Sequence, residues 1–191
     1  MLDFNPTTNG GKSIAELAAS LSKADLYRLT DEMIDTMQEI IADAVDADVT
    51  FVPDDSEAND TFGKPEEVNL SWTLGHVVVH ATASSEESAA LALVLARGLP
   101  VEGRSRYEVY WETVTTIVQA RHRLEESRRM RKAMLDAWPD EPHLEVTYAP
   151  SPRTGELNAI ARFILGLRHD TDHLGQLRKI MSQGRLVNAR R

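Results

Sequence analysis

Apolar residues recur at helical spacing early in the chain, from residue 22 to residue 46. The recurring positions are three or four residues apart and would line one face of a helix: Leu26, Leu29, Met33, Met37, Ile40, Ile41 and Ala44. Ser22 can cap this helix, which we expect to end near Asp46. Ser13 and Glu16 have the spacing of a capping box and predict a short helix before it.

Three more long helices are predicted downstream. The expected ranges are 69 or 71 to 97, about 107 to 137, and about 154 to 182 or 183. Asn69 or Ser71 can cap the first of them. Gly98 and Gly184 directly follow the first and the last, where glycine commonly ends a helix. Residues 143–148, which precede the last helix, have weak strand character.

The helix expected over 107–137 has a regular face and a charged outer half. The face would carry Tyr110, Val114, Ile117, Arg121 and Leu124. Residues 121–132 are dense in Arg and Glu, and the simplest interpretation is a solvated surface. Residues 48–68 lack helical periodicity and are interpreted as an acidic connector. Four long helices with little β-type alternation predict an all-α fold, specifically a four-helix bundle.

Length, charge and cysteine content narrow the class of protein. The 191 residues fit one domain, in which we expect a flexible N-terminus over 1–12 and a C-terminal tail over 184–191. The chain has no cysteine, which excludes disulfides and thiolate ligands and favours a reducing compartment. A net charge of −9 disfavours nucleic acid and anionic membranes as partners. No apolar run approaches the roughly 20 residues of a membrane span. We therefore expect a cytoplasmic protein.

Two of the predicted helices each carry a pair of histidines one turn apart. The pairs are His76 with His80 and His169 with His173, and Gln176 follows the second pair in the same sector. Residues four apart share a helix face, so two such helices can direct three or four imidazoles at one ion. A single pair of this kind is more simply a surface feature. Two pairs in strongly apolar helices favour a metal site.

Other polar residues extend these two faces. Thr73, Ser84 and Glu87 share the face of the first pair, where buried polar groups would need partners. Arg162 lies about two turns before the second pair, and Gly166 one turn before it would leave room for an approaching group.

The remaining candidates lack this context. His122 and His143 are expected at the surface. Asp170 and Asp172 flank the second pair but lie well away from its mean direction around the helix. They are therefore better placed behind the ligands or in solvent than as ligands themselves.

A site of three neutral imidazoles suits Zn²⁺, Ni²⁺ or Fe²⁺ and is a poor cage for Mg²⁺ or Ca²⁺. Three protein ligands leave at least one coordination position open, which is typical of a catalytic site. A metal in such a site would generate hydroxide or polarise a bound oxygen or sulfur.

With these motifs the chain resembles the DinB-like (YfiT-related) superfamily of metalloenzymes. Trp72-Thr73 followed by His80 matches one family stretch, and the stretch from His169 through His173 to Gln176 matches another. The resemblance extends from about residue 26 to residue 182. It implies a bundle of up-down-down-up topology that usually pairs into homodimers.

The resemblance also implies roles for individual residues. His80, His169 and His173 would be the metal ligands, and Gln176 would orient a ligand or pack against the last turn. His76 is an addition to the family pattern and would be a fourth donor, a proton shuttle or, as we favour, a group behind the ligands.

Characterised relatives include transferases and isomerases that use a low-molecular-weight thiol. The resemblance therefore implies a divalent-metal enzyme, with Zn or Ni ahead of Fe, that activates a thiol or water for transfer to a small electrophile. Arg162 would hold a substrate carboxylate or else extend to the rim. Glu87 and His76 are candidate proton carriers. The alternatives are a metal-dependent hydrolase and a non-enzymatic dimeric module held together by its metal.

Overall fold

The computed structural model describes residues 1–56, 58, 68–103, 109–152 and 154–188, and the regular elements within them are helices. These are α1 (Asn5–Thr8), α2 (Ile14–Ala18), α3 (Lys23–Ile40), α4 (Asp46–Val49), α5 (Leu74–Ala96), the 3-10 helix η1 (Trp111–Thr113), α6 (Ile117–Asp136) and α7 (Ala159–Asn188). The predicted all-α class is confirmed. Within residues 143–148, Tyr148 forms an isolated antiparallel bridge with Leu157.

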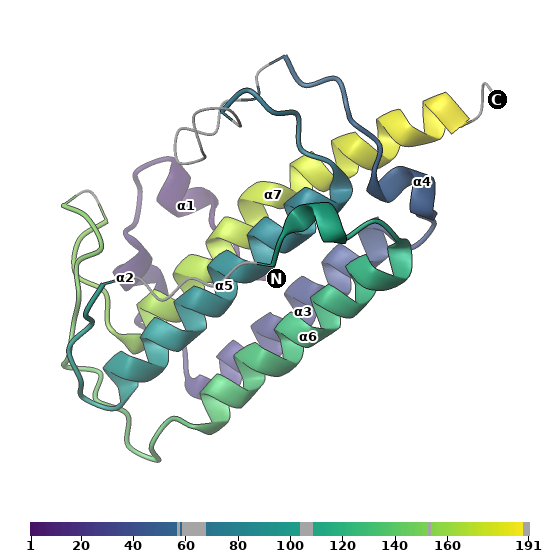
Figure 1. The fold of residues 1–191 in the computed structure, drawn as a ribbon. Helices are drawn as coiled ribbons and strands as arrows, with labels where there is room; N and C mark the ends of the chain where they lie inside the picture. The colour runs from purple at the N-terminus through teal and green to yellow at the C-terminus, as the bar shows by residue number, and fades with distance from the viewer. Residues whose placement is uncertain (57, 59–67, 104–108, 153, 189–191) are drawn as a thin grey trace.

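The four long helices α3, α5, α6 and α7 pack side by side as a bundle (Figure 1). Helices α3 and α7 run in one direction, and α5 and α6 run in the other. Contacts between helices agree with this arrangement. Gln38, near the end of α3, donates to the carbonyl oxygen of Arg121 near the start of α6. Likewise His80 of α5 meets His169 of α7, whereas Ser88 further along α5 meets the earlier residue Arg162.

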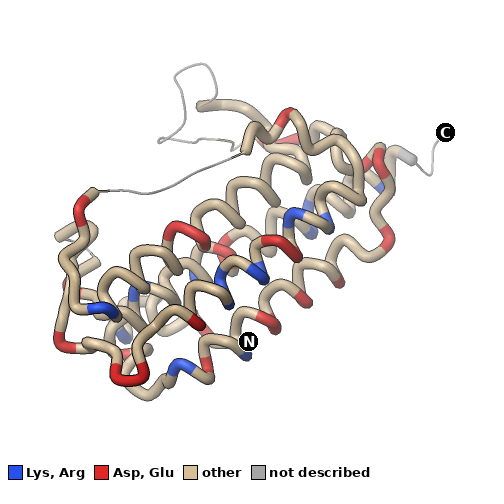
Figure 2. The backbone as a smooth tube through the Cα atoms, turned by 60° about the horizontal axis from the view of Figure 1, so that its bottom comes forward, with Lys and Arg blue, Asp and Glu red and all other residues tan. Residues whose placement is uncertain are grey.

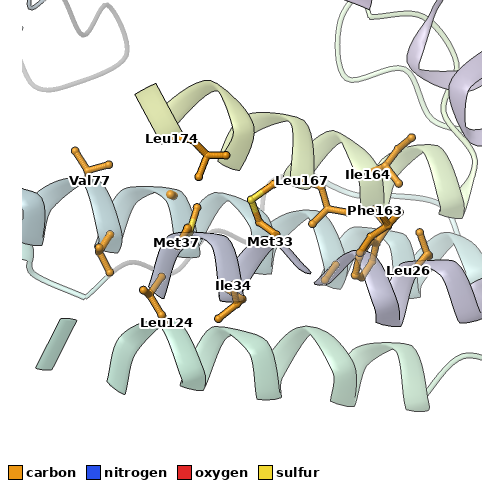
Figure 3. Close-up of a cluster of buried hydrophobic side chains, with 14 of the residues drawn as sticks. Leu26, Met33, Ile34, Met37, Val77, Leu124, Phe163, Ile164, Leu167 and Leu174 are labelled. Carbon is orange, nitrogen blue, oxygen red and sulfur yellow. The ribbon is translucent and has the colours of Figure 1, made fainter. Parts of the chain in front are cut away.

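All four long helices contribute to the hydrophobic core. Figure 3 labels Leu26, Met33, Ile34 and Met37 from α3, Val77 from α5, Leu124 from α6, and Phe163, Ile164, Leu167 and Leu174 from α7. The predicted apolar face of the first long helix is confirmed as a core face. Its predicted end near Asp46 is wrong, because α3 stops at Ile40 and α4 begins at Asp46. Ile41 and Ala44 still reach the core from the turn between them.

Side-chain caps explain where the helices begin. The predicted capping box at Ser13 is present, and a second one joins Ser22 to Asp25 at the start of α3. Helix α5 is capped by Thr73, whose Oγ1 accepts from the backbone N–H of His76, so a cap at residue 69 or 71 is wrong. Helix α6 begins only after Thr116, which forms a capping box with Gln119.

The predicted helix over 107–137 therefore started too early. Residues 104–108 lie outside the described part, and the described residues 109–115 form the short helix η1 with irregular backbone on either side of it. Tyr110 is largely exposed, whereas Val114 is buried and places its carbonyl oxygen against Gly75 of α5. A Cβ at Gly75 would lie 2.5 Å from that oxygen, so the close approach requires glycine.

Of the two helix ends predicted at glycines, one is confirmed and the other is wrong. Gly98 follows α5 with a φ of +75°, a conformation that favours glycine, and the predicted stop is confirmed. Helix α7 continues through Gly184 to Asn188, so the second stop is wrong. A Cβ at Gly184 would lie 2.7 Å from Oδ1 of Asp48, which shows that this glycine allows α4 to approach α7. At the other end of the chain, residues 5–8 form α1 and Phe4 is buried in the core.

Acidic and basic residues are interspersed along the helices (Figure 2). Between α3 and α6, Arg128 pairs with Asp31 and Asp35, and Lys132 also pairs with Asp31. Such pairs at the surface contribute little individually, typically about 0–1 kcal/mol. Within the described residues, no helix combines the length and the apolar character needed to span a bilayer.

Gly166 of α7 lies so close to α5 that a side chain at this position would collide with it. A Cβ there would lie 2.7 Å from Cβ of Ser88 and 3.0 Å from the backbone Cα of Ser85. The room expected beside Gly166 is therefore filled by α5. We expect Gly166→Ala to lower the free energy of unfolding by about 1–2 kcal/mol, because overpacking outweighs the gain in helix propensity.

Gly175 on the same helix provides a matched control for that prediction. No atom lies within 4 Å of a Cβ built there, so Gly175→Ala should raise the free energy of unfolding by about 0.5–1 kcal/mol. Urea denaturation of the metal-free protein measures both values. Equal stabilisation by the two substitutions would contradict the tight contact at Gly166.

Candidate metal centre

Three histidines from two helices converge in the structure. His80 lies on α5, and His169 and His173 lie one turn apart on α7. The Nε2 atoms of His80 and His169 are 3.1 Å apart. The ring centroids of the three residues are separated by 4.9, 5.0 and 4.6 Å, and one nitrogen from each lies within 4.8 Å of the others.

This geometry fits a shared metal ion. Two imidazole nitrogens about 2.0–2.1 Å from one ion lie roughly 2.9–3.4 Å apart at angles between about 90° and 109°. The 3.1 Å separation of His80 and His169 falls in that range. All three side chains are half-buried, so the site combines a packed surrounding with access from solvent. The three histidines can therefore hold a metal ion with a coordination position left over.

Gln176 contacts one of these histidines from behind. Its Oε1 lies 2.9 Å from Nδ1 of His173 and can accept a hydrogen bond from it. A proton on Nδ1 leaves the lone pair of His173 on Nε2, the nitrogen that a metal ion would bind. The contact also fixes the orientation of the ring. This is the geometry that an orienting role for Gln176 requires.

We expect Gln176→Ala to weaken metal binding by about 10- to 100-fold, the usual effect of removing a partner that orients a ligand. Isothermal titration of the metal-free protein with Zn²⁺ or Ni²⁺ measures this change. Gln183→Ala is the matched control, because Gln183 lies on the same helix and bonds to the backbone of Asp54. Equal affinities for the Gln176 variant and the control would contradict the orienting role.

An aromatic stack borders the three histidines. The ring of His76 lies between those of Trp72 and Trp111, with centroid distances of 4.4 and 4.5 Å and interplanar angles of 20° and 2°. Trp72 also contacts His80 at 4.5 Å and His173 at 5.8 Å. His76 is thus part of a wall beside the convergent histidines and is itself buried.

Glu87 and Arg162 lie further along the bundle. Each is seven residues from a convergent histidine on its own helix, a rise of about 10 Å. Both are buried, and Nη1 of Arg162 donates to Oγ of Ser88 at 2.7 Å. Arg162 therefore does not extend to the rim. The structure brings His80, His169, His173 and Gln176 together and leaves Glu87 and Arg162 two turns away.

The family model of the DinB superfamily matches residues 12–177. The chain belongs to the DinB superfamily. The matched range contains the three convergent histidines and Gln176. Comparison with curated proteins and comparison with solved structures both gave no match.

The helical fold and the convergent histidines of this DinB-superfamily chain could be predicted from sequence patterns. A buried ion pair beside the histidines could not. Arg131 of α6 and Asp170 of α7 form an ion pair with an Nη1–Oδ2 distance of 2.6 Å, and their side chains are 1% and 0% exposed. The prediction of a solvated surface is therefore wrong at Arg131, and a solvated Asp170 is also excluded. Asp172 is exposed, which is one of the two positions expected for it.

Two hydroxyl groups complete this group. Oγ of Ser85 donates to Oδ1 of Asp170 at 2.7 Å, and Nε of Arg131 donates to Oγ of Ser127 at 2.9 Å. We call Ser85, Ser127, Arg131 and Asp170 the buried polar layer. Burial raises the pKa of the Asp170 carboxyl above its usual value, and the charge of Arg131 and the hydrogen bond from Ser85 oppose that rise.

A second ion pair joins α5 and α6 nearby. Arg123 pairs with Glu86 and donates from Nε to Oγ1 of Thr82 at 3.1 Å. Burial lowers the pKa of Arg123, and the positive charge of Arg131 lowers it further. The two remaining histidines, His122 and His143, are exposed, as predicted.

Proposed function

We propose that this protein is a divalent-metal-dependent enzyme. In the proposal His80, His169 and His173 hold one ion, which activates a low-molecular-weight thiol or water for transfer to a small electrophilic substrate. The observation that supports it best is the convergence of three half-buried imidazoles, two of them with Nε2 atoms 3.1 Å apart. Three protein donors are one fewer than a closed tetrahedral structural site needs.

The donor set guides the choice of metal. Neutral imidazoles suit Zn²⁺ or Ni²⁺, with Fe²⁺ as an alternative, and suit Mg²⁺ or Ca²⁺ poorly. When bound, such an ion lowers the pKa of a coordinated water or thiol and so supplies a nucleophile at neutral pH. Because the chain has no cysteine, a thiol in this reaction must come from a second small molecule.

The chain's own residues would complete the site. Gln176 would hold His173 in the tautomer that binds through Nε2. Trp72 and His76 would form an aromatic wall that limits the approach of water from one side. Arg162, about two turns from His169 along α7, would offer positive charge to the far end of an elongated anionic substrate and not to the reacting atom.

Turnover assays test the proposal directly. Tag-free protein loaded with Zn²⁺ or Ni²⁺ is assayed with a panel of low-molecular-weight thiols and electrophiles, and in parallel with esters and amides. The proposal predicts turnover that requires the metal and is lost in His173→Ala. Where a thiol is the nucleophile, turnover also requires the added thiol. His122→Ala is the control, because His122 is an exposed histidine of α6.

The assay also separates the alternatives. Ester or amide hydrolysis that is indifferent to thiols would identify a hydrolase at the same site. No turnover, together with a large fall in melting temperature on chelation, would contradict the enzyme proposal and favour a metal that only stabilises the bundle.

A further inference from the structure

The buried polar layer joins α7, the helix that carries His169 and His173, to both α5 and α6. Asp170 of α7 receives Nη1 of Arg131 from α6 and Oγ of Ser85 from α5, at 2.6 and 2.7 Å. Asp170 directly follows His169 and precedes His173 by three residues. The layer therefore anchors α7 within the same turn that presents both histidines.

An anchor at this position controls the rotation of α7 about its axis. Side-chain atoms of a helix extend to a radius of about 5–6 Å, so a rotation of roughly 10° moves them by about 1 Å. Ligands of a metal site must be held within about 0.5 Å and 10–20° of their working geometry. A small rotation of α7 is thus sufficient to misdirect His169 and His173 relative to His80.

Stability alone is a poor explanation for the layer. Removing two charges from water is costly, and well-packed apolar residues often stabilise a protein as well as a buried ion pair does. In some proteins a buried pair instead fixes one arrangement of helices, because a shifted arrangement leaves the charges without partners. Apolar packing in the core cluster that includes Met33, Met37 and Leu167 tolerates small rotations more easily.

We propose that Arg131 and Asp170 are positioning residues, which fix the rotation of α7 and so direct His169 and His173 toward His80. This inference rests on the proposed metal site. It assigns a task in metal binding to residues that are not among the proposed ligands.

The test replaces both charges together, so that neither is left buried alone. We expect the double substitution Arg131→Met with Asp170→Leu to weaken Zn²⁺ or Ni²⁺ binding by about 10- to 100-fold. We also expect a changed d–d absorption spectrum of the Co²⁺-loaded protein, because that spectrum reports coordination geometry. The urea midpoint of the metal-free protein should change little. Titration calorimetry, absorption spectroscopy and urea denaturation measure the three quantities.

The ion pair between Arg128 and Asp31 provides a control. It is partly buried and also joins two helices, α6 and α3, neither of which carries a histidine of the site. The double substitution Arg128→Met with Asp31→Leu should leave metal affinity and the Co²⁺ spectrum unchanged. Equal losses in the two double variants would overturn the inference, because they would show a general loosening of the bundle. Wild-type affinity in the first variant would overturn it as well.

Ser85→Ala keeps the inference testable if the first double variant does not fold. It removes one anchor of Asp170 and retains the ion pair, and it should weaken metal binding by up to about 10-fold. Wild-type affinity in this variant would overturn the inference. The two proposals fail in different ways. If His173→Ala binds metal like the wild type, the proposed function fails, whereas loss of binding there with no effect of the layer variants contradicts only the positioning role.

Discussion

His173→Ala is expected to weaken binding of Zn²⁺ or Ni²⁺ by about 100- to 1000-fold while the helical fold is retained. Structural zinc sites with four ligands bind with about 10–16 kcal/mol, or roughly 2.5–4 kcal/mol for each ligand. Each 1.4 kcal/mol changes a dissociation constant about tenfold. His173 also carries the hydrogen bond to Gln176, so its loss removes both a donor and the group that Gln176 orients. Titration calorimetry and far-ultraviolet circular dichroism measure the two quantities.

A histidine outside the site controls for general effects of the substitution. His122→Ala removes an exposed imidazole from α6 and should bind metal like the wild type. The prediction fails if His173→Ala and His122→Ala have the same affinity. It also fails if the affinity of His173→Ala drops only because the protein unfolds, which circular dichroism would reveal.

Arg131→Met alone is expected to lower the free energy of unfolding by about 3–5 kcal/mol. The substitution leaves the carboxylate of Asp170 buried, with no exposed surface and without its cationic partner. The hydrogen bond from Ser85 remains but cannot replace the lost charge. Since domains are typically stable by only about 5–15 kcal/mol, this loss is a large share of the total. Urea denaturation of the metal-free protein measures it.

The double variant with Asp170→Leu shows whether the loss comes from the unpaired charge. Removing both charges should restore most of the free energy of unfolding, because no buried charge then lacks a partner. Arg129→Met is a surface control, since Arg129 pairs with Glu126 in an exposed position and should cost about 0–1 kcal/mol. A similar small cost for Arg131→Met would contradict the burial of the pair.

The helices and the convergent histidines could be predicted because both depend on spacing along one segment. Period-three and period-four apolar residues predict α3 as a core helix, and a one-turn spacing predicts that His169 and His173 share a face. The family motifs then select His80 as the partner from α5. The boundaries were less predictable where a local cap decides the result. Thr116 starts α6 later than the apolar spacing of Tyr110 and Val114 suggests.

Features that depend on contacts between distant segments could not be predicted in the same way. Arg131 stands among other Arg and Glu residues of α6, and nothing in that segment indicates that its partner is Asp170 on α7. Gly184 resembles a helix stop, but its glycine serves a close contact with Asp48. Trp111 stacks on His76 from a segment that was expected to be helical. In each case the deciding neighbour is more than 30 residues away.

X-ray absorption spectroscopy of the tag-free protein loaded with one equivalent of Zn²⁺ or Ni²⁺ tests the central claim most directly. We expect three imidazole nitrogens at about 2.0–2.1 Å, together with at least one oxygen that is not from the protein. The signal of one nitrogen should disappear in His80→Ala. A shell without imidazole, or one with every position filled by protein atoms, would contradict an open metal site built from His80, His169 and His173.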